Sequence, residues 1–268
     1  MPDGCPAAAA LARTTHLGIG AHQDDLEFMA FHGVAECFGK TKQWFCGLTC
    51  TDGAGSSRSG LYAGLGDVEM ADLRREEQRA AAVAGNYGAM IQLGYTSSEV
   101  RDRSDARLWE DLRGILEAMK PEVVYTHNLA DKHPTHVAVA WAAIEALRSL
   151  PPEIRPQRVI GCEGWRDLDW LPDNEKVVMD VTGHEALAAK LCACFVSQIG
   201  GGKRYDLAVA GRRAAHATFS DPHSPDRAAQ VIFGIDVMPL IKDAALDPGE
   251  YVDGMIDRFR RAVRTSHG

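Results

Sequence analysis

The strongest constraint on the fold is an apolar run at residues 16–20 (His-Leu-Gly-Ile-Gly) that continues directly into the polar stretch 21–27 (Ala-His-Gln-Asp-Asp-Leu-Glu). An apolar run that ends in small residues and leads into a helical pattern predicts a β-strand followed by a helix. The polar residues would then lie at the carboxyl edge of a sheet, where open α/β folds bind ligands. On such a helix His22 and Asp25 would share a face, with Asp24 turned roughly 100° from Asp25. The stretch predicts two metal ligands and a spare carboxylate.

Apolar runs and amphipathic helical patterns alternate over much of the chain. Strands are predicted at residues 15–20, 44–51, 90–93, 121–126, 158–162 and 177–181. Helices are predicted at residues 26–37, 67–87, 106–119, 137–150 and 185–198. Strands that alternate with helices favour a Rossmann-like, doubly wound, mostly parallel sheet with helices on both faces, which is a three-layer α/β sandwich.

The length of 268 residues exceeds that of an average domain, but α/β folds of about 250 residues often surround a single sheet. We therefore expect one domain over residues 1–268. Its motif-bearing core would lie at about residues 15–150, and residues 151–268 would complete the sheet and the substrate pocket.

A second polar cluster, residues 127–136, follows the predicted strand 121–126. Pro134 suits the first position of a helix, so His133 and His136 would lie at a helix start on the carboxyl edge of a second strand. Because parallel strands of one sheet end at the same edge, we expect the two polar clusters to converge.

The two clusters repeat one pattern, since His22 and Asp25 are three residues apart, as are His133 and His136. Three ligands of the type His, Asp and His with an open fourth position are typical of catalytic zinc sites, because structural sites fill all four positions, mostly with cysteine. Zinc lowers the pKa of water to about 7 and polarises carbonyls, so such a site suits hydrolysis of an amide or an ester. Iron or cobalt also accepts imidazole and carboxylate ligands.

The remaining polar residues have roles in such a hydrolysis. Asp24 is next to a predicted ligand but turned away from it, so it could take the proton from the water and return it to the leaving amine. His133, one turn before His136, could donate a hydrogen bond to the oxyanion. Asp131 could orient one of these histidines through a hydrogen bond, or equally could belong only to the start of the helix.

Both clusters resemble the motifs of the zinc-dependent N-deacetylases related to N-acetylglucosaminyl-phosphatidylinositol de-N-acetylase, the PIG-L or LmbE-like family. The family's Ala-His-Pro-Asp-Asp-Glu stands here as Ala-His-Gln-Asp-Asp-Leu at residues 21–26, and its His-Pro-Asp-His as His-Pro-Thr-His at residues 133–136. The resemblance covers roughly residues 15–150. It implies three zinc ligands, a general base and a residue that stabilises the transition state: His22, Asp25 and His136, then Asp24, then His133.

Three positions depart from the family's motifs: Gln23 replaces Pro, Leu26 replaces Glu and Thr135 replaces Asp. None of these changes removes a predicted ligand or the base. Two weaker matches support the resemblance. Thr-Asp-Gly at residues 51–53 resembles the family's Thr-x-Gly loop, and Arg-Arg-Glu-Glu at residues 74–77 resembles its Arg-x-x-Glu helix, whose Arg contacts substrate in some members.

Basic residues are candidates for binding the rest of the substrate, because they are locally dense in a chain of net charge −8. They lie on the predicted helix 67–87 and in the glycine-rich segment 200–213: Arg74, Lys203, Arg204 and Arg212, with Arg213 beside them. Guanidinium groups bind phosphate or carboxylate in two-pronged fashion, so these residues predict an anionic or heavily hydroxylated substrate. Alternatively, they are solvated or pair with the surplus Asp and Glu.

These observations predict a zinc-dependent hydrolase that removes an N-acetyl or similar N-acyl group from an amino sugar or a small molecule that contains one. Two alternatives keep the metal, namely an amidase that cuts a larger amide, such as a thiol conjugate, and a binding protein with a non-catalytic site. A nucleotide-binding protein is disfavoured, because the fingerprint Gly-x-Gly-x-x-Gly would need its third glycine where Gln23 stands.

Composition excludes several other classes of protein. The net charge of −8 argues against a nucleic-acid partner, which clustered excess Lys and Arg would bind. No apolar stretch of about 18 residues occurs, so membrane insertion is not expected. The seven cysteines are odd in number and include no Cys-x-x-Cys pair, which argues against a disulfide framework and favours the cytoplasm. A small N-acylated substrate is the expected partner, and a homo-oligomer is compatible with the sequence.

Overall fold

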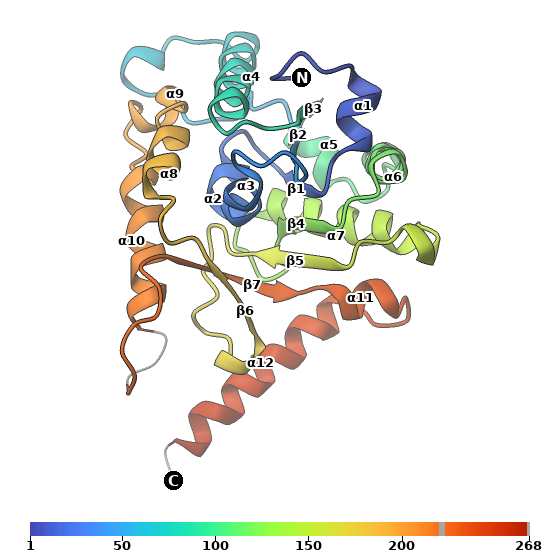
Figure 1. The fold of residues 1–268 in the computed structure, drawn as a ribbon, viewed down its shortest axis with the longest axis vertical. Coiled ribbons are helices and arrows are strands. Elements are labelled where there is room, and N and C mark those ends of the chain that lie inside the picture. Colours follow the sequence, from blue (N-terminus) through green and yellow to red (C-terminus); the bar gives the residue numbers. More distant parts are fainter. Residues whose placement is uncertain (220–222, 267–268) are drawn as a thin grey trace.

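A computed structural model of the chain describes residues 1–219 and 223–266 (Figure 1). Within these residues, seven strands form one sheet in the order β3-β2-β1-β4-β5-β7-β6. The strands are β1 (His16–Gly20), β2 (Phe45–Thr51), β3 (Ala89–Tyr95), β4 (Val123–His127), β5 (Arg158–Cys162), β6 (Lys176–Asp180) and β7 (Val231–Asp236). Neighbouring strands from β3 to β5 are parallel, whereas β7 is antiparallel to both β5 and β6. The predicted doubly wound, mostly parallel sheet is confirmed.

The order of the strands reverses between β1 and β4. From β1 the chain proceeds to β2 and β3 on one side, and from β4 it proceeds to β5 on the other. The two strands are adjacent and in register from His16 opposite Val123 to Ile19 opposite Thr126, so their carboxyl ends lie side by side. Open α/β sheets bind ligands at such a switch point, and here both strands are followed by polar residues.

Helices cover both faces of the sheet, which gives the predicted three layers (Figure 1). One hydrophobic layer joins the strands to α1 (Ala7–Ala12), α5 (Ser97–Arg101), α6 (Arg107–Met119), α7 (Pro134–Ser149) and α11 (Met238–Lys242). The other joins them to α2 (Asp25–Met29), α3 (Phe31–Cys37), α4 (Asp67–Ala84) and α8 (Glu185–Cys192). The remaining helices are α9 (Val196–Ile199), α10 (Tyr205–Thr218) and α12 (Pro248–Thr265).

Two helices that were predicted as continuous are interrupted in the structure. The predicted helix 26–37 is divided into α2 and α3 at Ala30, whose backbone leaves the helical region, and the predicted helix 185–198 is divided into α8 and α9. Strands from residue 16 to residue 236 nevertheless share one sheet, which supports our proposal of a single domain. None of the described helices is long and apolar enough to cross a membrane.

Glycines bring α2 and α3 close to the sheet. A Cβ atom at Gly18 in β1 would lie 3.0 Å from Leu26 Cδ2, and one at Gly47 in β2 would lie 2.7 Å from Leu26 Cδ1. On the helix side, a Cβ at Gly33 in α3 would lie 2.5 Å from Cε2 of the buried Tyr125. Side chains at these positions would push the helices outwards. The glycines therefore hold the start of α2, and the polar turn before it, against the end of β1.

We predict that Gly33→Ala destabilises the protein by about 1–3 kcal/mol, because overpacking against Tyr125 outweighs the better helix propensity of alanine. Gly114→Ala in α6 is the matched control, since its Cβ would meet nothing within 4 Å. It should stabilise the protein by up to about 1 kcal/mol. Urea denaturation of both variants measures the difference, and equal effects at the two positions would contradict the close packing of α3.

Candidate active site

The polar turn between β1 and α2 brings His22 and Asp25 together. Residues 21–24 are not helical: Asp24 has a left-handed backbone conformation, with φ at 96°, and α2 begins at Asp25. The His22 N–H donates to Asp25 Oδ2 at 2.6 Å, and the Asp25 N–H donates to the His22 carbonyl at 3.3 Å. The prediction that helical spacing aligns these two residues was therefore wrong, since a hydrogen-bonded turn does so. Left-handed backbone is uncommon for a residue other than glycine and is often found at functional sites.

The second polar cluster lies where it was predicted, at the start of α7. His133 precedes the helix, Pro134 is the first helical residue and His136 lies in the first turn. Asp131 Oδ1 accepts a hydrogen bond from the His133 N–H at 3.0 Å, and its Oδ2 lies 3.4 Å from His136 Nδ1. Asp131 also accepts the Trp165 N–H at 3.0 Å. Both interpretations of Asp131 therefore hold in the geometry, because it contacts a histidine and also fixes the loop before the helix.

Donor atoms of three residues converge between the two clusters. His22 Nδ1 lies 3.2 Å from His136 Nε2 and 3.3 Å from Asp25 Oδ2, and His136 Nε2 lies 3.4 Å from Asp25 Oδ1. Ligands at 2.0–2.2 Å from a tetrahedral zinc ion are roughly 3.3–3.6 Å from one another. The spacing and the mixture of nitrogen and oxygen donors therefore fit a divalent transition metal.

Two other histidines lie close enough to be considered as ligands. Potential ligand atoms also lie within 4.8 Å of one another in the sets His22, His133, His136 and Asp25, His127, His136. His127 is at the end of β4, where its Nε2 accepts the Ala21 N–H at 2.9 Å. That hydrogen bond occupies the lone pair of Nε2, so we interpret His127 as a residue that holds the end of β1 rather than as a ligand through this nitrogen.

Sequence analysis missed His127, although a signal was present. It ends the apolar run that forms β4, and its position beside β1 follows from the parallel sheet. Burial and the neighbouring His136 lower the pKa of His127 to about 4, so its ring is neutral at pH 7. The ring stacks on that of His136 at a centroid distance of 3.9 Å. A polar residue at the end of an otherwise apolar strand is therefore worth including in a predicted site.

His133 lies beside the convergent donors with an unused nitrogen. Its ring is 4.9 Å from that of His22 and 4.5 Å from that of His136, and its Nδ1 has no hydrogen-bond partner within the described part of the chain. Burial and the charge of His136 lower the pKa of His133 to about 4. A neutral imidazole carries one N–H, which can be donated to a developing oxyanion.

Asp24 is held by Arg74, which is almost fully buried at 1% exposure. Arg74 Nη2 donates to Asp24 Oδ2 at 2.7 Å and also contacts the Gln23 carbonyl, while Nη1 donates to Glu77 Oε2 at 2.6 Å. Of the alternatives to substrate binding, solvation is wrong for Arg74, because this residue is buried and pairs with Asp24 and Glu77. Because the guanidinium of Arg74 already binds Asp24, its contact with a substrate stays a prediction.

The pKa of Asp24 suits a base that works near neutral pH. Burial raises the pKa to about 6, while the positive charge of Arg74 opposes that rise. General bases are most effective when their pKa is close to the working pH. The same arginine keeps the carboxylate in one orientation, because its guanidinium is itself held by hydrogen bonds to Glu77 Oε2 and to the Gln23 carbonyl.

A cavity of about 760 Å³ opens over these residues. Its floor includes His22, Asp24 and His136, and its walls include Lys203 and Arg212, both of which were predicted from the sequence to bind substrate. The predicted contribution of Arg204 finds no support in this geometry. Arg204 is exposed, pairs with Asp206 at 2.9 Å and is not among the described residues that line the cavity.

Arg213 also lines the cavity, although it is almost fully buried. It is 2% exposed, and it donates to the carbonyl oxygens of Glu27 and Phe28, both at 3.0 Å. Arg213 therefore ties α10 to α2.

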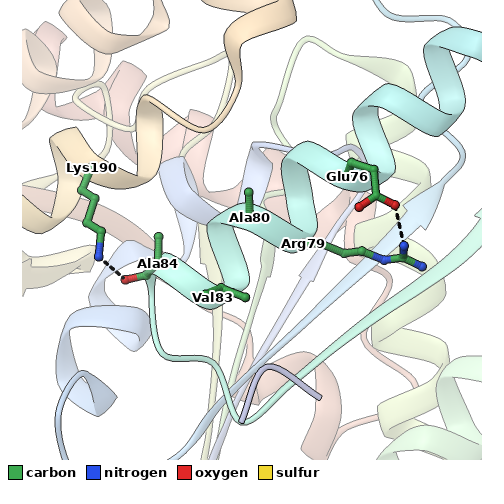
Figure 2. A pocket seen from close by; sticks show the side chains of 6 residues that line it. All are labelled: Glu76, Arg79, Ala80, Val83, Ala84 and Lys190. Carbon is green, nitrogen blue, oxygen red and sulfur yellow. Dashed lines mark hydrogen bonds and ion pairs between the residues drawn. The ribbon is translucent and has the colours of Figure 1, made fainter. Parts of the chain in front are cut away.

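A second hollow, of about 480 Å³, lies between α4 and α8 (Figure 2). Its charged groups are occupied by local contacts, because Arg79 pairs with Glu76 at 2.5 Å and Lys190 donates to the Ala84 carbonyl at 3.4 Å. Figure 2 shows that the remaining side chains, those of Ala80, Val83 and Ala84, are small and apolar. We assign no catalytic role to this hollow.

Comparison with known proteins supports the family resemblance of the motifs. Residues 17–147 match the family model described as PIG-L, GlcNAc-PI de-N-acetylase. This segment, just under half of the chain, includes both histidine clusters, and it is similar to the family that the motifs resemble. A search of curated protein sequences gives no match.

Solved structures share the fold. They include 4-carboxy-2-hydroxymuconate hydratase from Pseudomonas putida KT2440 (21% identity, TM-score 0.63, covering 83% of this chain and 95% of the hydratase). N,N'-diacetylchitobiose deacetylase from Pyrococcus horikoshii is similar at 17% identity and TM-score 0.61, covering 83% of this chain and 84% of that one. A zinc inhibited form of teicoplanin deacetylase is similar at 16% identity and TM-score 0.60, covering 83% and 97%. Since a hydratase and deacetylases occur on one fold, the reaction depends on the site.

A further buried carboxylate, that of Glu27, is connected to Asp24 by hydrogen bonds through Gln78. Its Oε1 accepts hydrogen bonds from Tyr87 Oη at 2.7 Å and Gln78 Nε2 at 2.9 Å, and Gln78 also accepts the Asp24 N–H at 3.1 Å. Its Oε2 has no partner within the described residues. Burial raises the pKa of Glu27 to about 7. Glu27 is therefore held mostly protonated below neutral pH.

We predict that Glu27 makes the apo protein less stable as the pH rises. The folded-state pKa of about 7 exceeds the ordinary value of 4.5. The contribution of Glu27 to the free energy of unfolding is therefore fully present below pH 4.5 and is lost as the pH rises through 7. Glu27→Gln keeps the two accepted hydrogen bonds and removes this titration. The variant should gain stability relative to the wild type between pH 5 and pH 8, by up to roughly 3 kcal/mol.

Urea denaturation at the two pH values, with chelator present, measures this gain. The exposed Glu110 in α6 provides the control variant Glu110→Gln, which should show no such gain. An equal difference between wild type and Glu27→Gln at both pH values would contradict the prediction.

Proposed function

We propose that this protein is a metal-dependent N-deacetylase that removes an N-acetyl or similar N-acyl group from an amino sugar or a small molecule containing one. The observation that carries the proposal is the convergence of His22 Nδ1, the Asp25 carboxylate and His136 Nε2, at 3.2–3.4 Å from one another. They lie at the floor of a cavity that Asp24 also lines, and the pKa of Asp24 is about 6. A metal site beside a base, both open to a substrate-sized cavity, is the arrangement that amide hydrolysis needs.

We propose His22, Asp25 and His136 as the ligands of a divalent metal, with zinc as the first choice. Two imidazoles and a carboxylate are the donors of many catalytic zinc sites, although iron and cobalt accept the same set. When bound, the metal supplies an activated water and polarises the amide carbonyl. Asp131, which contacts His136 Nδ1, would fix the ring orientation of this ligand.

Two residues of the chain would then act on the reacting groups. Asp24 would accept the proton of the attacking water and return it to the leaving amine, with Arg74 holding its carboxylate in place. His133 would donate its N–H to the oxyanion that forms on the attacked carbonyl. Each of these roles matches that which the family resemblance assigns to the same motif position.

The comparisons support the reaction class. The matching family is described as a de-N-acetylase, and two similar structures are described as deacetylases of diacetylchitobiose and teicoplanin. An amidase that cuts a larger amide, such as a thiol conjugate, and a non-catalytic metal-binding protein are the alternatives. We further propose that the partner is a small molecule rather than nucleic acid, and that the protein acts in the cytoplasm, since its seven cysteines are free in the structure.

Asp24→Asn should retain the metal and lower turnover by about 10² to 10⁴, the usual worth of general acid–base catalysis. Metal content by atomic absorption and acetate release from N-acetylglucosamine derivatives are measured together. Asp72→Asn, on the exposed face of α4, is the control and should change neither. Loss of metal from Asp24→Asn with full turnover on resupply would exchange the roles of Asp24 and Asp25. Metal without release of any amine product would favour the non-catalytic alternative.

His133→Ala should also retain the metal while the rate falls, by about 2.7–4 kcal/mol of transition-state stabilisation if it is a single oxyanion donor. The same two measurements decide the ligand set. Loss of the metal from His133→Ala would show instead that His133 is a ligand, in the alternative set with His22 and His136. His136→Ala is the comparison, because it should lose the metal in either set.

A further inference from the structure

Aromatic side chains form one wall of the cavity, centred on Trp165. The Trp165 ring lies 6.3 Å from the ring of His133 and 6.2 Å, edge to face, from that of Tyr205, which in turn contacts Phe28 at 5.4 Å. The side chain remains 41% exposed although it lines the cavity. Its backbone N–H is held by Asp131, the carboxylate that also contacts His136. The Trp165 backbone is thus anchored next to the proposed catalytic site, and the partly exposed residue lines the cavity.

Two lysines from distant segments meet at this indole. Lys132 Nζ, from the loop before α7, lies 5.9 Å from the ring centroid, and Lys203 Nζ, from the loop before α10, lies 5.2 Å from it. No carboxylate in the described ranges pairs with either ammonium group. Any molecule bound against the ring would therefore lie within reach of two positive charges.

The balance of charge in the cavity favours an anion. Its lining carboxylates already have partners: Asp24 binds Arg74, Asp25 contacts histidines, and Glu163 binds His216 at 2.8 Å. Two further cations of the lining, Arg101 and Arg212, donate to backbone carbonyls rather than to carboxylates. The positive charges around the opening are therefore left without counter-charges from the described residues.

We propose that the cavity contains a subsite for an anionic amino sugar, in which Trp165 packs against the sugar ring and Lys132 and Lys203 bind its phosphate or carboxylate group. The C–H groups of a sugar face suit the electron-rich face of an indole, and ammonium groups bind both kinds of anion. The inference rests on the proposed deacetylase function and adds to it the charge of the substrate. It assigns specificity to residues 132, 165 and 203, none of which belongs to the two metal-binding motifs.

Binding is measured by titration calorimetry on metal-loaded Asp24→Asn, which is expected to turn ligands over slowly. The probes are N-acetylglucosamine, N-acetylglucosamine 6-phosphate and N-acetylmuramic acid, which are neutral, phosphorylated and carboxylated. At least one anionic sugar should bind about 10-fold or more tightly than the neutral one, as expected for charge-assisted hydrogen bonds. The anionic sugar that binds more tightly shows whether the subsite prefers a phosphate or a carboxylate group. Raising the salt concentration should reduce the difference in affinity between anionic and neutral sugars.

Further substitutions test the two lysines and the indole of the subsite separately. Lys132→Gln with Lys203→Gln should lower the affinity for the anionic sugar to that of the neutral one, whereas Trp165→Ala should weaken both. Arg204→Ala, in the same loop as Lys203 but outside the cavity lining, should change neither. Trp165→Tyr checks that loss of the aromatic ring, and not misfolding, causes the effect. Equal affinities for neutral and anionic sugars, or no effect of the paired lysine change, would overturn the proposal.

The wild-type enzyme distinguishes failure of this proposal from failure of the proposed function. Selective binding without acetate release from any of the three sugars would leave the subsite standing and reject the deacetylase. Acetate release with equal kcat/KM for neutral and anionic sugars would confirm the deacetylase and reject the subsite.

Discussion

The buried carboxylate of Asp25 joins the two halves of the candidate site. It accepts the His22 N–H at 2.6 Å, and its oxygens lie 3.2 Å from His127 Nε2 and 3.4 Å from His136 Nε2. Burial alone would raise the pKa of Asp25, but the charge of His136 is the largest of the effects that hold it well below its ordinary value. The end of β1 and the start of α7 are thus held together around one negative charge, which a bound cation would further stabilise. An isolated buried carboxylate would be costly, so the histidines and Asp25 depend on one another.

A second chain of contacts connects the C-terminal part of the molecule to Asp24. Glu77 accepts the Ser197 N–H at 2.6 Å and its hydroxyl at 2.9 Å, binds Arg74 at 2.6 Å, and Arg74 in turn binds Asp24 at 2.7 Å. The family match ends at residue 147, so α9, which carries Ser197, lies outside it. The position of the proposed base therefore depends on a segment that lies outside the matched residues.

The sequence predicts those features that depend on strand ends, and misses those that depend on neighbours in three dimensions. Apolar runs followed by polar residues located both clusters and the mostly parallel sheet. Periodicity could not show that Asp24 adopts a left-handed conformation, because a turn and a first helical turn space polar residues alike. It could not show that Arg74 and Glu77 are buried, since α9 covers them from 120 residues further along the chain. β7 was missed although residues 231–235 are largely apolar, because a short apolar run fits either a strand or a buried helical segment.

The charge of the whole molecule and the charge of its cavity have opposite signs, and distance decides which one a ligand experiences. At physiological ionic strength, charges more than about 8 Å apart in solvent are largely screened. The net charge of −8 is spread over the surface and contributes little inside the opening. Lys132 and Lys203, both within 6 Å of the Trp165 ring centroid, lie within this screening distance of a molecule bound there. A negative overall charge is therefore compatible with the anionic substrate that we propose.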